Sequence, residues 1–180
     1  MRELLQRKNG RFALVVLIGL GCCGAGLPAA AQTTPYTPEP ALVALGKSMW
    51  KDQVPCRECH GAMGNGIPDI PQQPSGANFR TTTLSPEDLA TTIKCGRPGT
   101  EMPHFDPKAY TDTRCYGSTA ADMGTNVPPV GMSLSDRQVN ALVAFIEATF
   151  VGKGDPTFEQ CVAFWGEGAS TCARYPHAAK

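Results

Sequence analysis

Apolar side chains recur at helical spacing in three stretches of this chain. The first covers residues 39–51 and stops shortly before Pro55, which cannot continue a helix. The second, residues 85–95, opens with Ser85 as an N-cap followed by a first-turn proline. The third, residues 135–150, opens with a capping-box pattern. The apolar positions are Leu42, Val43, Leu45, Met49 and Trp50, then Leu89 and Ile93, then Val139, Leu142, Val143, Phe145, Ile146 and Phe150. Each stretch predicts a helix.

The rest of the sequence favours loops over strands. No stretch shows sustained alternation of apolar and polar residues, and there is no internal repeat. Residues 61–76 contain four glycines and three prolines, which predict an irregular loop. We therefore expect an all-α fold of three to five helices.

The N-terminus has the organisation of a secretory signal peptide. Four basic residues lie within the first eleven positions, an apolar run extends from Phe12 to about Cys23, and three alanines end at Ala31. The apolar run is shorter than the ~20 residues that span a bilayer as a helix, so an uncleaved anchor is the less favoured alternative. No later segment resembles a transmembrane span. We expect cleavage of residues 1–31 and export to the periplasm.

The exported part should comprise a flexible N-terminus (32–38), one domain (39–151) and a C-terminal extension (152–180). Its 149 residues are a normal length for one domain. Cleavage removes four of the sixteen Lys and Arg and one of the sixteen Asp and Glu, which leaves twelve bases and fifteen acids. Such an acidic protein is ill suited to nucleic acid or anionic membranes, whereas a partner with a basic patch suits it.

The cysteines of the exported part divide into two groups. Cys56 and Cys59 form one Cys-x-x-Cys pair, and four others lie farther along the chain. In an oxidising compartment these four should form two disulfides, for which three pairings are possible. The local pairing, Cys95–Cys115 with Cys161–Cys172, fits the sequence segments best.

The pentapeptide Cys56-Arg57-Glu58-Cys59-His60 is the attachment sequence of c-type haem. Its two thiols can each form a thioether with a haem vinyl group, and His60 can supply an imidazole to the iron. Half of a zinc site or a redox dithiol is the alternative for a Cys-x-x-Cys pair alone. The motif therefore predicts one covalently bound haem c.

Iron held by His60 requires a second protein ligand for electron transfer, or an open face for catalysis or gas binding. The strongest candidate is Met102, which lies in an irregular loop (residues 96–105) between two predicted helices. Met132, just before the last helix, is the best substitute, and His104 would give a bis-histidine haem. The less favoured candidates are Met49, Met63, Met123 and His177.

Together these features resemble the class I c-type cytochromes. The matching residues, within roughly 40–150, are Gly46, Trp50, the Cys56–His60 motif with Gly61, Met102-Pro103, Leu142 and Phe145. The resemblance implies that the first and last helices cross, with Gly46 against the Phe145 face, and that the haem lies in a crevice between the histidine and methionine loops. It also implies a proline carbonyl, that of Pro71 or Pro74, as acceptor of the second ring proton of His60.

Two segments depart from a minimal member of that family. Residues 106–132 form an insertion that we expect to cover one rim of the haem. If Cys95 pairs with Cys115, the disulfide brackets Met102 and restrains its loop, an effect of about 3 kcal/mol. The extension 152–180 carries aromatic residues within or beside the second cysteine pair, and we expect it to cover the core, with docking of a partner as the alternative.

The resemblance implies a one-electron carrier rather than an enzyme. Electrons would come from a periplasmic dehydrogenase, including quinoprotein alcohol dehydrogenases, and pass to a terminal oxidase or another cytochrome. A dedicated haem subunit of a multisubunit oxidoreductase is the main alternative. A haem peroxidase or gas sensor is a lesser alternative and requires that Met102 leaves the iron.

Overall fold

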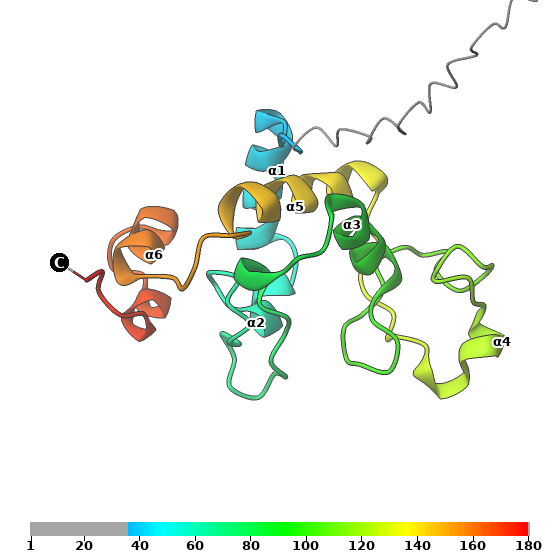
Figure 1. The fold of residues 1–180 in the computed structure, drawn as a ribbon. Coiled ribbons are helices and arrows are strands. Elements are labelled where there is room, and N and C mark those ends of the chain that lie inside the picture. The colour runs from blue at the N-terminus through cyan, green and yellow to red at the C-terminus, as the bar shows by residue number, and fades with distance from the viewer. Residues whose placement is uncertain (1–35, 180) are drawn as a thin grey trace, which may run out of the picture. The chain divides into compact units, whose positions relative to one another are not determined.

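The computed structural model describes residues 36–179 of the chain. The expected signal peptide, and the expected flexible N-terminus up to residue 35, lie outside the described residues. The helices are α1 (Pro40–Asp52), α2 (Cys56–His60), α3 (Pro86–Cys95), α4 (Ala120–Met123), α5 (Asp136–Thr149) and α6 (Phe158–Trp165), with 3₁₀ turns at Phe79–Thr81, Gly124–Asn126 and Ser170–Arg174 (Figure 1). Within this part of the chain there is no strand, so the all-α prediction is confirmed. The six α-helices of residues 36–179 exceed the expected three to five, because α2 and α4 are very short and α6 lies in the C-terminal extension.

Helix α1 crosses α5, and this crossing is the most extensive contact between elements (Figure 1). The contact point is Gly46, where an added Cβ would lie 2.0 Å from the carbonyl oxygen of Ala141 and 2.6 Å from Cβ of Phe145. Only a residue without a side chain allows the two backbones to approach this closely. The predicted crossing of Gly46 with the Phe145 face is confirmed.

The helix starts follow the local sequence. Ser135 accepts a hydrogen bond from the backbone N–H of Gln138, whose side chain binds back to the backbone of Ser135, which completes the predicted capping box. The Ser85 hydroxyl likewise accepts from the backbone N–H of Asp88 at the start of α3. Helix α6 begins at Thr157, which caps the backbone N–H of Gln160.

The core lies where α1 meets α5. Trp50 is fully buried there and packs against Phe145 and Phe150 at ring-centroid distances of 5.8 and 5.2 Å. The Trp50 indole N–H donates to the Ala62 carbonyl oxygen at 3.3 Å, just beyond α2. The core thereby holds the segment that follows the Cys-x-x-Cys-His motif.

Residues 106–132, termed the 106–132 segment below, are cross-linked to the end of α3. The Cys95–Cys115 disulfide makes this connection, and both cysteines are buried with Tyr110 in a small cluster. The hydroxyls of Tyr110 and Tyr116 each donate to a carbonyl at the end of α3, those of Cys95 and Gly96, at 2.9 Å. Both tyrosines have positive φ (60° and 55°), a backbone conformation that residues other than glycine rarely adopt.

Residues 152–179, termed the C-terminal segment below, contain α6 and the last 3₁₀ turn. The second disulfide, Cys161–Cys172, joins them, so the predicted local pairing is confirmed for both pairs. Phe164 contacts the core, with its ring centroid 5.8 Å from that of Phe145. Across residues 36–179 we find no helix with the length and apolar character needed to cross a membrane.

Candidate functional site

The Cys-x-x-Cys-His motif forms the single turn of α2, which ends at Gly61 with φ 78°. Cys56 and Cys59 are free thiols, while every other cysteine in the described chain is in a disulfide. Burial raises the pKa of the Cys56 thiol to about 12 and raises that of Cys59 as well. A redox dithiol needs the opposite, a thiol that ionises readily. Two unpaired, protonated thiols beside a histidine fit thioether attachment of haem.

The zinc alternative lacks further ligands. A structural zinc site takes four protein ligands. Among residues 36–179, no group of three His, Cys, Asp or Glu side chains is arranged to hold a metal ion. The site chemistry therefore centres on the α2 motif itself.

The ring of His60 is oriented by the main chain of a later segment. Its Nδ1 lies 2.9 Å from the Ala77 carbonyl oxygen, which can only accept, so Nδ1 carries a proton and Nε2 remains for a metal. The ring is 8% exposed and stacks on Phe79 with centroids 4.3 Å apart and an interplanar angle of 16°. Burial lowers the His60 pKa, the hydrogen bond to Ala77 opposes this shift, and the net effect favours the neutral ring that binds iron.

The prediction of Pro71 or Pro74 as this acceptor is wrong. The chain passes both prolines before it comes back to α2. It does so at Gly76, whose backbone N–H donates to the Cys59 carbonyl oxygen at 2.9 Å. A Cβ at Gly76 would lie 2.7 Å from Nδ1 of His60, so glycine is needed where the chain passes the ring. The next residue, Ala77, is the one whose carbonyl reaches the histidine.

The predicted loop 61–76 is held against α2 by Asp69. Its carboxylate accepts from the backbone N–H of Ala62 at 3.1 Å and pairs with Arg57 at 3.2 Å. The loop exposes two large apolar side chains, Ile67 (57% exposed) and Ile70 (40%). Exposed apolar side chains of this size are typical of a surface that a ligand or a partner covers.

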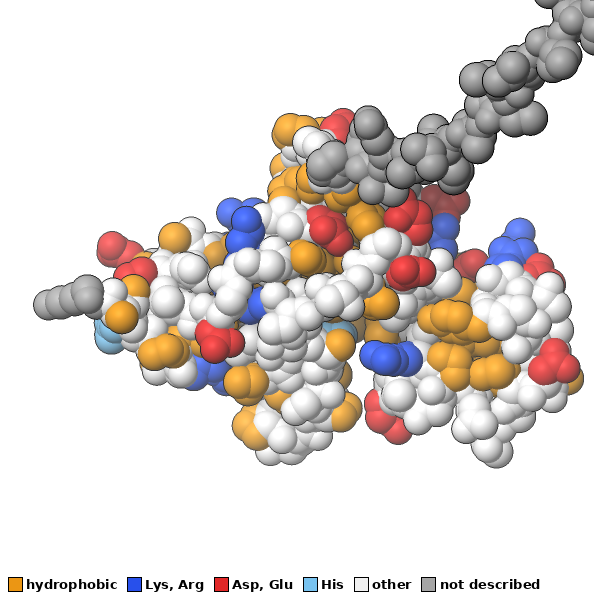
Figure 2. Space-filling view, in the orientation of Figure 1, with side chains coloured by type: hydrophobic (Ala, Val, Ile, Leu, Met, Phe, Trp, Pro, Cys, Tyr) orange, Lys and Arg blue, Asp and Glu red, His pale blue; other side chains and the backbone are white. Residues whose placement is uncertain are grey.

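The loop that carries Met102 is fixed by its own backbone. The carbonyl oxygen of Met102 accepts a hydrogen bond from the backbone N–H of Arg97 at 3.2 Å, and the backbone N–H of Met102 donates to the Thr100 hydroxyl at 3.2 Å. Gly96, with φ 65°, approaches so closely that a Cβ there would lie 2.8 Å from the Met102 carbonyl oxygen. The Met102 side chain is partly buried. Figure 2 shows the surface hollowed between the loop that follows α2 and this second loop.

The other candidate ligands have different surroundings. Met49 is fully buried in the core, and Met63 is buried with the C-terminal segment. His104 is buried, with Nδ1 3.0 Å from the Asp106 carbonyl oxygen. Met132 is 44% exposed. The remaining two are Met123, which packs on the Cys95–Cys115 cluster, and His177, which pairs with Glu159.

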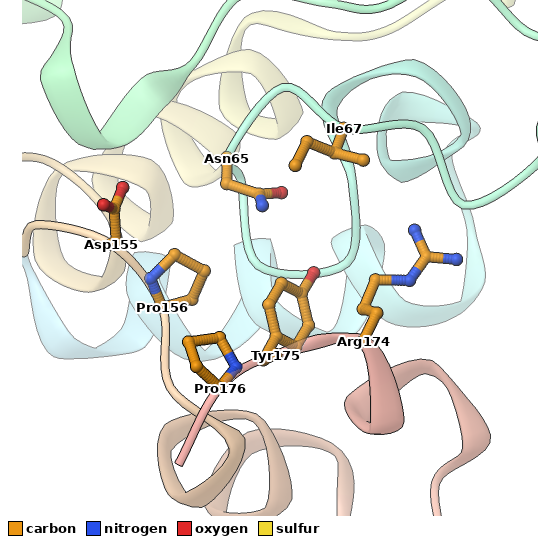
Figure 3. A pocket seen from close by; sticks show the side chains of 7 residues that line it. All are labelled: Asn65, Ile67, Asp155, Pro156, Arg174, Tyr175 and Pro176. Atoms are coloured by element: carbon orange, nitrogen blue, oxygen red, sulfur yellow. The ribbon is translucent and has the colours of Figure 1, made fainter. Parts of the chain in front are cut away.

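The sequence pattern did not indicate Arg80, which joins the site to the C-terminal segment. This side chain is 3% exposed and donates to the carbonyl oxygen of Met63, three residues after the motif, at 3.2 Å. It also donates to Gly154 and Lys153 in the C-terminal segment. A pocket of about 590 Å³ opens beside this junction and is lined in part by Asn65 and Ile67 of the loop and by Asp155 and Tyr175 of the C-terminal segment (Figure 3).

Known proteins resemble this chain in part. Residues 41–117 match the family model described as cytochrome c oxidase, cbb3-type, subunit III. Among solved structures, a chain of the Kuenenia stuttgartiensis reducing HAO-like protein complex Kustc0457/Kustc0458 is similar, with 20% identity and a TM-score of 0.41. The match covers 65% of this chain and 47% of the other, so this chain spans about half of that relative's length. The search of curated proteins found no match.

Proposed function

The chain is a c-type cytochrome with covalently bound haem c, and on that premise we propose that it is a one-electron carrier whose iron is held by His60 and Met102. Cys56 and Cys59 would form the thioethers. The observation that carries this proposal is the hydrogen bond between Nδ1 of His60 and the Ala77 carbonyl oxygen, which fixes the tautomer whose Nε2 can bind iron.

When bound, the haem supplies one-electron exchange between ferric and ferrous iron, and methionine ligation favours the ferrous form. The side chains need to hold the group and exclude water, and none has to act as acid, base or nucleophile. His60 would hold the iron with little freedom of its own, because its ring is buried, stacked on Phe79 and hydrogen-bonded. Met102 would supply the second ligand, on a loop that its backbone hydrogen bonds already shape.

The proposed location is the periplasm. Two disulfides in a chain of this size support an oxidising compartment, because they are rare in reducing ones. Residues 1–31 have the composition of a signal peptide. The mass of the mature protein tests the cleavage: a chain that begins at Gln32 supports export, and a chain that keeps residues 1–31 contradicts it.

The proposed partners follow from this role. A periplasmic dehydrogenase, such as a quinoprotein alcohol dehydrogenase, would reduce the haem, and a terminal oxidase or another cytochrome would oxidise it. Fifteen acidic against twelve basic residues in the exported part favour partners that present a basic patch. Such contacts would be small and sensitive to salt.

A second candidate function is that of a haem subunit in a multisubunit oxidoreductase. The family description names an oxidase subunit, and this observation favours the candidate. A stable complex buries a large, substantially apolar interface, whereas a shuttle dissociates readily in salt. Co-purification in high salt would support the subunit, and loss of the partner in high salt would support the shuttle.

The experiment that tests iron ligation is optical spectroscopy of the oxidised holoprotein. Methionine-ligated ferric haem has a weak long-wavelength charge-transfer band, which Met102→Ala should abolish. Met132→Ala is the matched control and should keep the band, since that side chain is the best alternative ligand. Loss of the band in Met132→Ala alone would contradict the assignment of Met102. A wild type without the band would favour a different ligand or an open iron, as in a peroxidase or gas sensor.

A further inference from the structure

Arg80 brings an unusual charge into the interior, a buried guanidinium bonded only to uncharged oxygens. It is 3% exposed. Its four acceptors are the carbonyl oxygens of Met63 (3.2 Å), Lys153 (3.4 Å) and Gly154, and the amide oxygen of Gln160 (3.0 Å). Within the part of the chain that is described, no carboxylate lies within ion-pair distance of it. The positive charge is solvated by dipoles but is not neutralised.

The negative charge that acts most on Arg80 is that of Asp155, which is exposed to solvent. Burial lowers the Arg80 pKa, and the field of Asp155 opposes this shift. Asp155 is exposed and lines the open pocket beside the junction, together with Tyr175 (Figure 3). Water screens a carboxylate in this position more than it screens a buried cation. Asp155 therefore offsets only part of the charge of Arg80.

Those surroundings include the segments that hold His60. Phe79, the residue before Arg80, stacks on the imidazole ring at 4.3 Å. Ala77, three residues before Arg80, accepts the Nδ1 proton. On the other side, Arg80 donates to Met63, three residues after His60. Arg80 therefore contacts the segment just after His60 through its side chain, and it belongs itself to the segment that stacks on the ring and accepts its proton.

From this arrangement we propose that Arg80 sets the reduction potential of the haem, and that the C-terminal segment serves to keep its charge out of water. Reduction adds one electron, supplied by a partner protein, to ferric iron and gives ferrous iron. A buried cation nearby lowers the free energy of the reduced form more than that of the oxidised form, so it raises the potential. This inference rests on the proposed function, because it requires a haem on His60.

The C-terminal segment has a direct part in this device. It provides three of the four acceptors, from Lys153, Gly154 and Gln160. Without these groups the guanidinium would be hydrated, and its field at the haem would fall because the local dielectric would rise. The C-terminal segment would therefore keep water away from the guanidinium, in addition to packing against the core.

The test is the midpoint potential of the holoprotein, measured by spectroelectrochemical titration for Arg80→Gln, Arg80→Lys and Lys153→Gln. Arg80→Gln should shift the potential downward, and Arg80→Lys should leave the potential close to that of the wild type because it keeps the charge. Lys153→Gln is the matched control: it removes the same charge from an exposed side chain and leaves the backbone acceptor in place. Its shift should be several times smaller and should vanish in high salt, whereas that of Arg80→Gln should persist.

Two results would overturn the inference. Equal downward shifts in Arg80→Gln and Arg80→Lys would show a structural role alone, and an unchanged potential in Arg80→Gln would show no role. If Arg80→Gln does not assemble with haem, Gln160→Glu provides the test, since a carboxylate at this acceptor would pair with the guanidinium and neutralise its charge. The potential should then fall, and an unchanged or raised potential would refute the idea. The methionine band separates the two proposals: its absence from the wild type contradicts Met102 ligation, whereas its presence with unaltered potentials contradicts only the role of Arg80.

Discussion

The 106–132 segment and the C-terminal segment are both cross-linked, but their disulfides constrain different parts of the chain. Cys95–Cys115 joins the end of α3 to the 106–132 segment across 20 residues, and Met102 lies inside that loop. Cys161–Cys172 spans 11 residues and lies wholly within the C-terminal segment. The first disulfide restrains a segment relative to the domain, whereas the second closes a segment on itself.

Their attachments differ in the same way. The 106–132 segment binds the loop before it through the main chain: the N–H of Gly99 donates to Asn126 and that of His104 to Pro129. The C-terminal segment is held largely by side chains, including Arg80 and the Lys51 ammonium, which lies 5.0 Å from the Trp165 ring centroid. Position is thus secured by covalent and main-chain bonds in one region and by replaceable side chains in the other.

The largest expected effect comes from damage to the helix crossing on which both regions depend. Gly46→Val would force its side chain into the Ala141 carbonyl and Phe145, and it should lower the free energy of unfolding by about 3 kcal/mol or more. Ala44→Val is the control, because residue 44 is exposed on the same helix and should cost only about 0.5 kcal/mol. Urea unfolding measures both, and equal losses would contradict the crossing as the structure has it.

Removal of each disulfide separates the two regions directly. Cys95→Ser with Cys115→Ser should cost about 3 kcal/mol of stability and weaken or abolish the methionine band, because the Met102 loop loses its restraint. Cys161→Ser with Cys172→Ser should cost slightly less, since its loop is shorter, and should leave the band intact. Urea unfolding and the oxidised spectrum provide the comparison. Loss of the band in both variants would show that the two disulfides act alike.

The sequence predicted the helices of the core and the disulfides of both additions, but not helix α6 or the contacts of Arg80. The stripe from Leu42 to Trp50, the caps at Ser85 and Ser135, and the local cysteine pairing all rest on short-range rules, and the structure agrees with each. The start of helix α6 is also indicated by the sequence, because Thr157 three residues before Gln160 is a capping-box pattern.

The contacts of His60 were less accessible to sequence reasoning. Its acceptor is a main-chain carbonyl, which every residue has, and loop closure through Gly76 selects Ala77. Arg80 was missed because arginine is rarely buried, so composition alone places it at the surface. Both features depend on contacts between segments far apart in the chain, and no local pattern records them.

The tyrosine pair at the end of α3 offers a smaller test of how the 106–132 segment is held. Tyr110→Phe removes a hydrogen bond to the buried Cys95 carbonyl and should cost about 1–2 kcal/mol, because that oxygen stays out of water. Tyr116→Phe removes an equal bond, to Gly96, from a ring that is 48% exposed, and water can replace it. Its cost should be below about 1 kcal/mol. A larger loss for Tyr116→Phe in urea unfolding would reverse this assignment.

The smallest expected effect concerns the end of the C-terminal segment and depends on pH. The Glu159 carboxylate accepts hydrogen bonds from the backbone N–H of Ala178 and from His177, which lower its pKa from 4.5 to about 2. Because the folded-state pKa is depressed, the stabilisation is present above about pH 4.5 and is lost as the pH falls towards 2. The protection factor of the Ala178 amide, which corrects the exchange rate for the intrinsic effect of pH, should fall over that range. Glu159→Gln should remove the pH dependence, and an unchanged profile in this variant would exclude the carboxylate as its source.

The main-chain acceptor at position 77 also determines how the site responds to mutation. A side-chain acceptor for His60 could be deleted by one base change, but every amino acid that replaces Ala77 keeps a carbonyl oxygen. The orientation of the His60 ring is therefore robust to substitution of Ala77, its hydrogen-bond partner, and sensitive to substitution of Gly76, where any side chain would meet the imidazole. The position most sensitive to mutation is therefore Gly76, one residue away from the carbonyl that binds His60. A saturation screen of residues 76 and 77 should find many tolerated substitutions at Ala77 and few at Gly76.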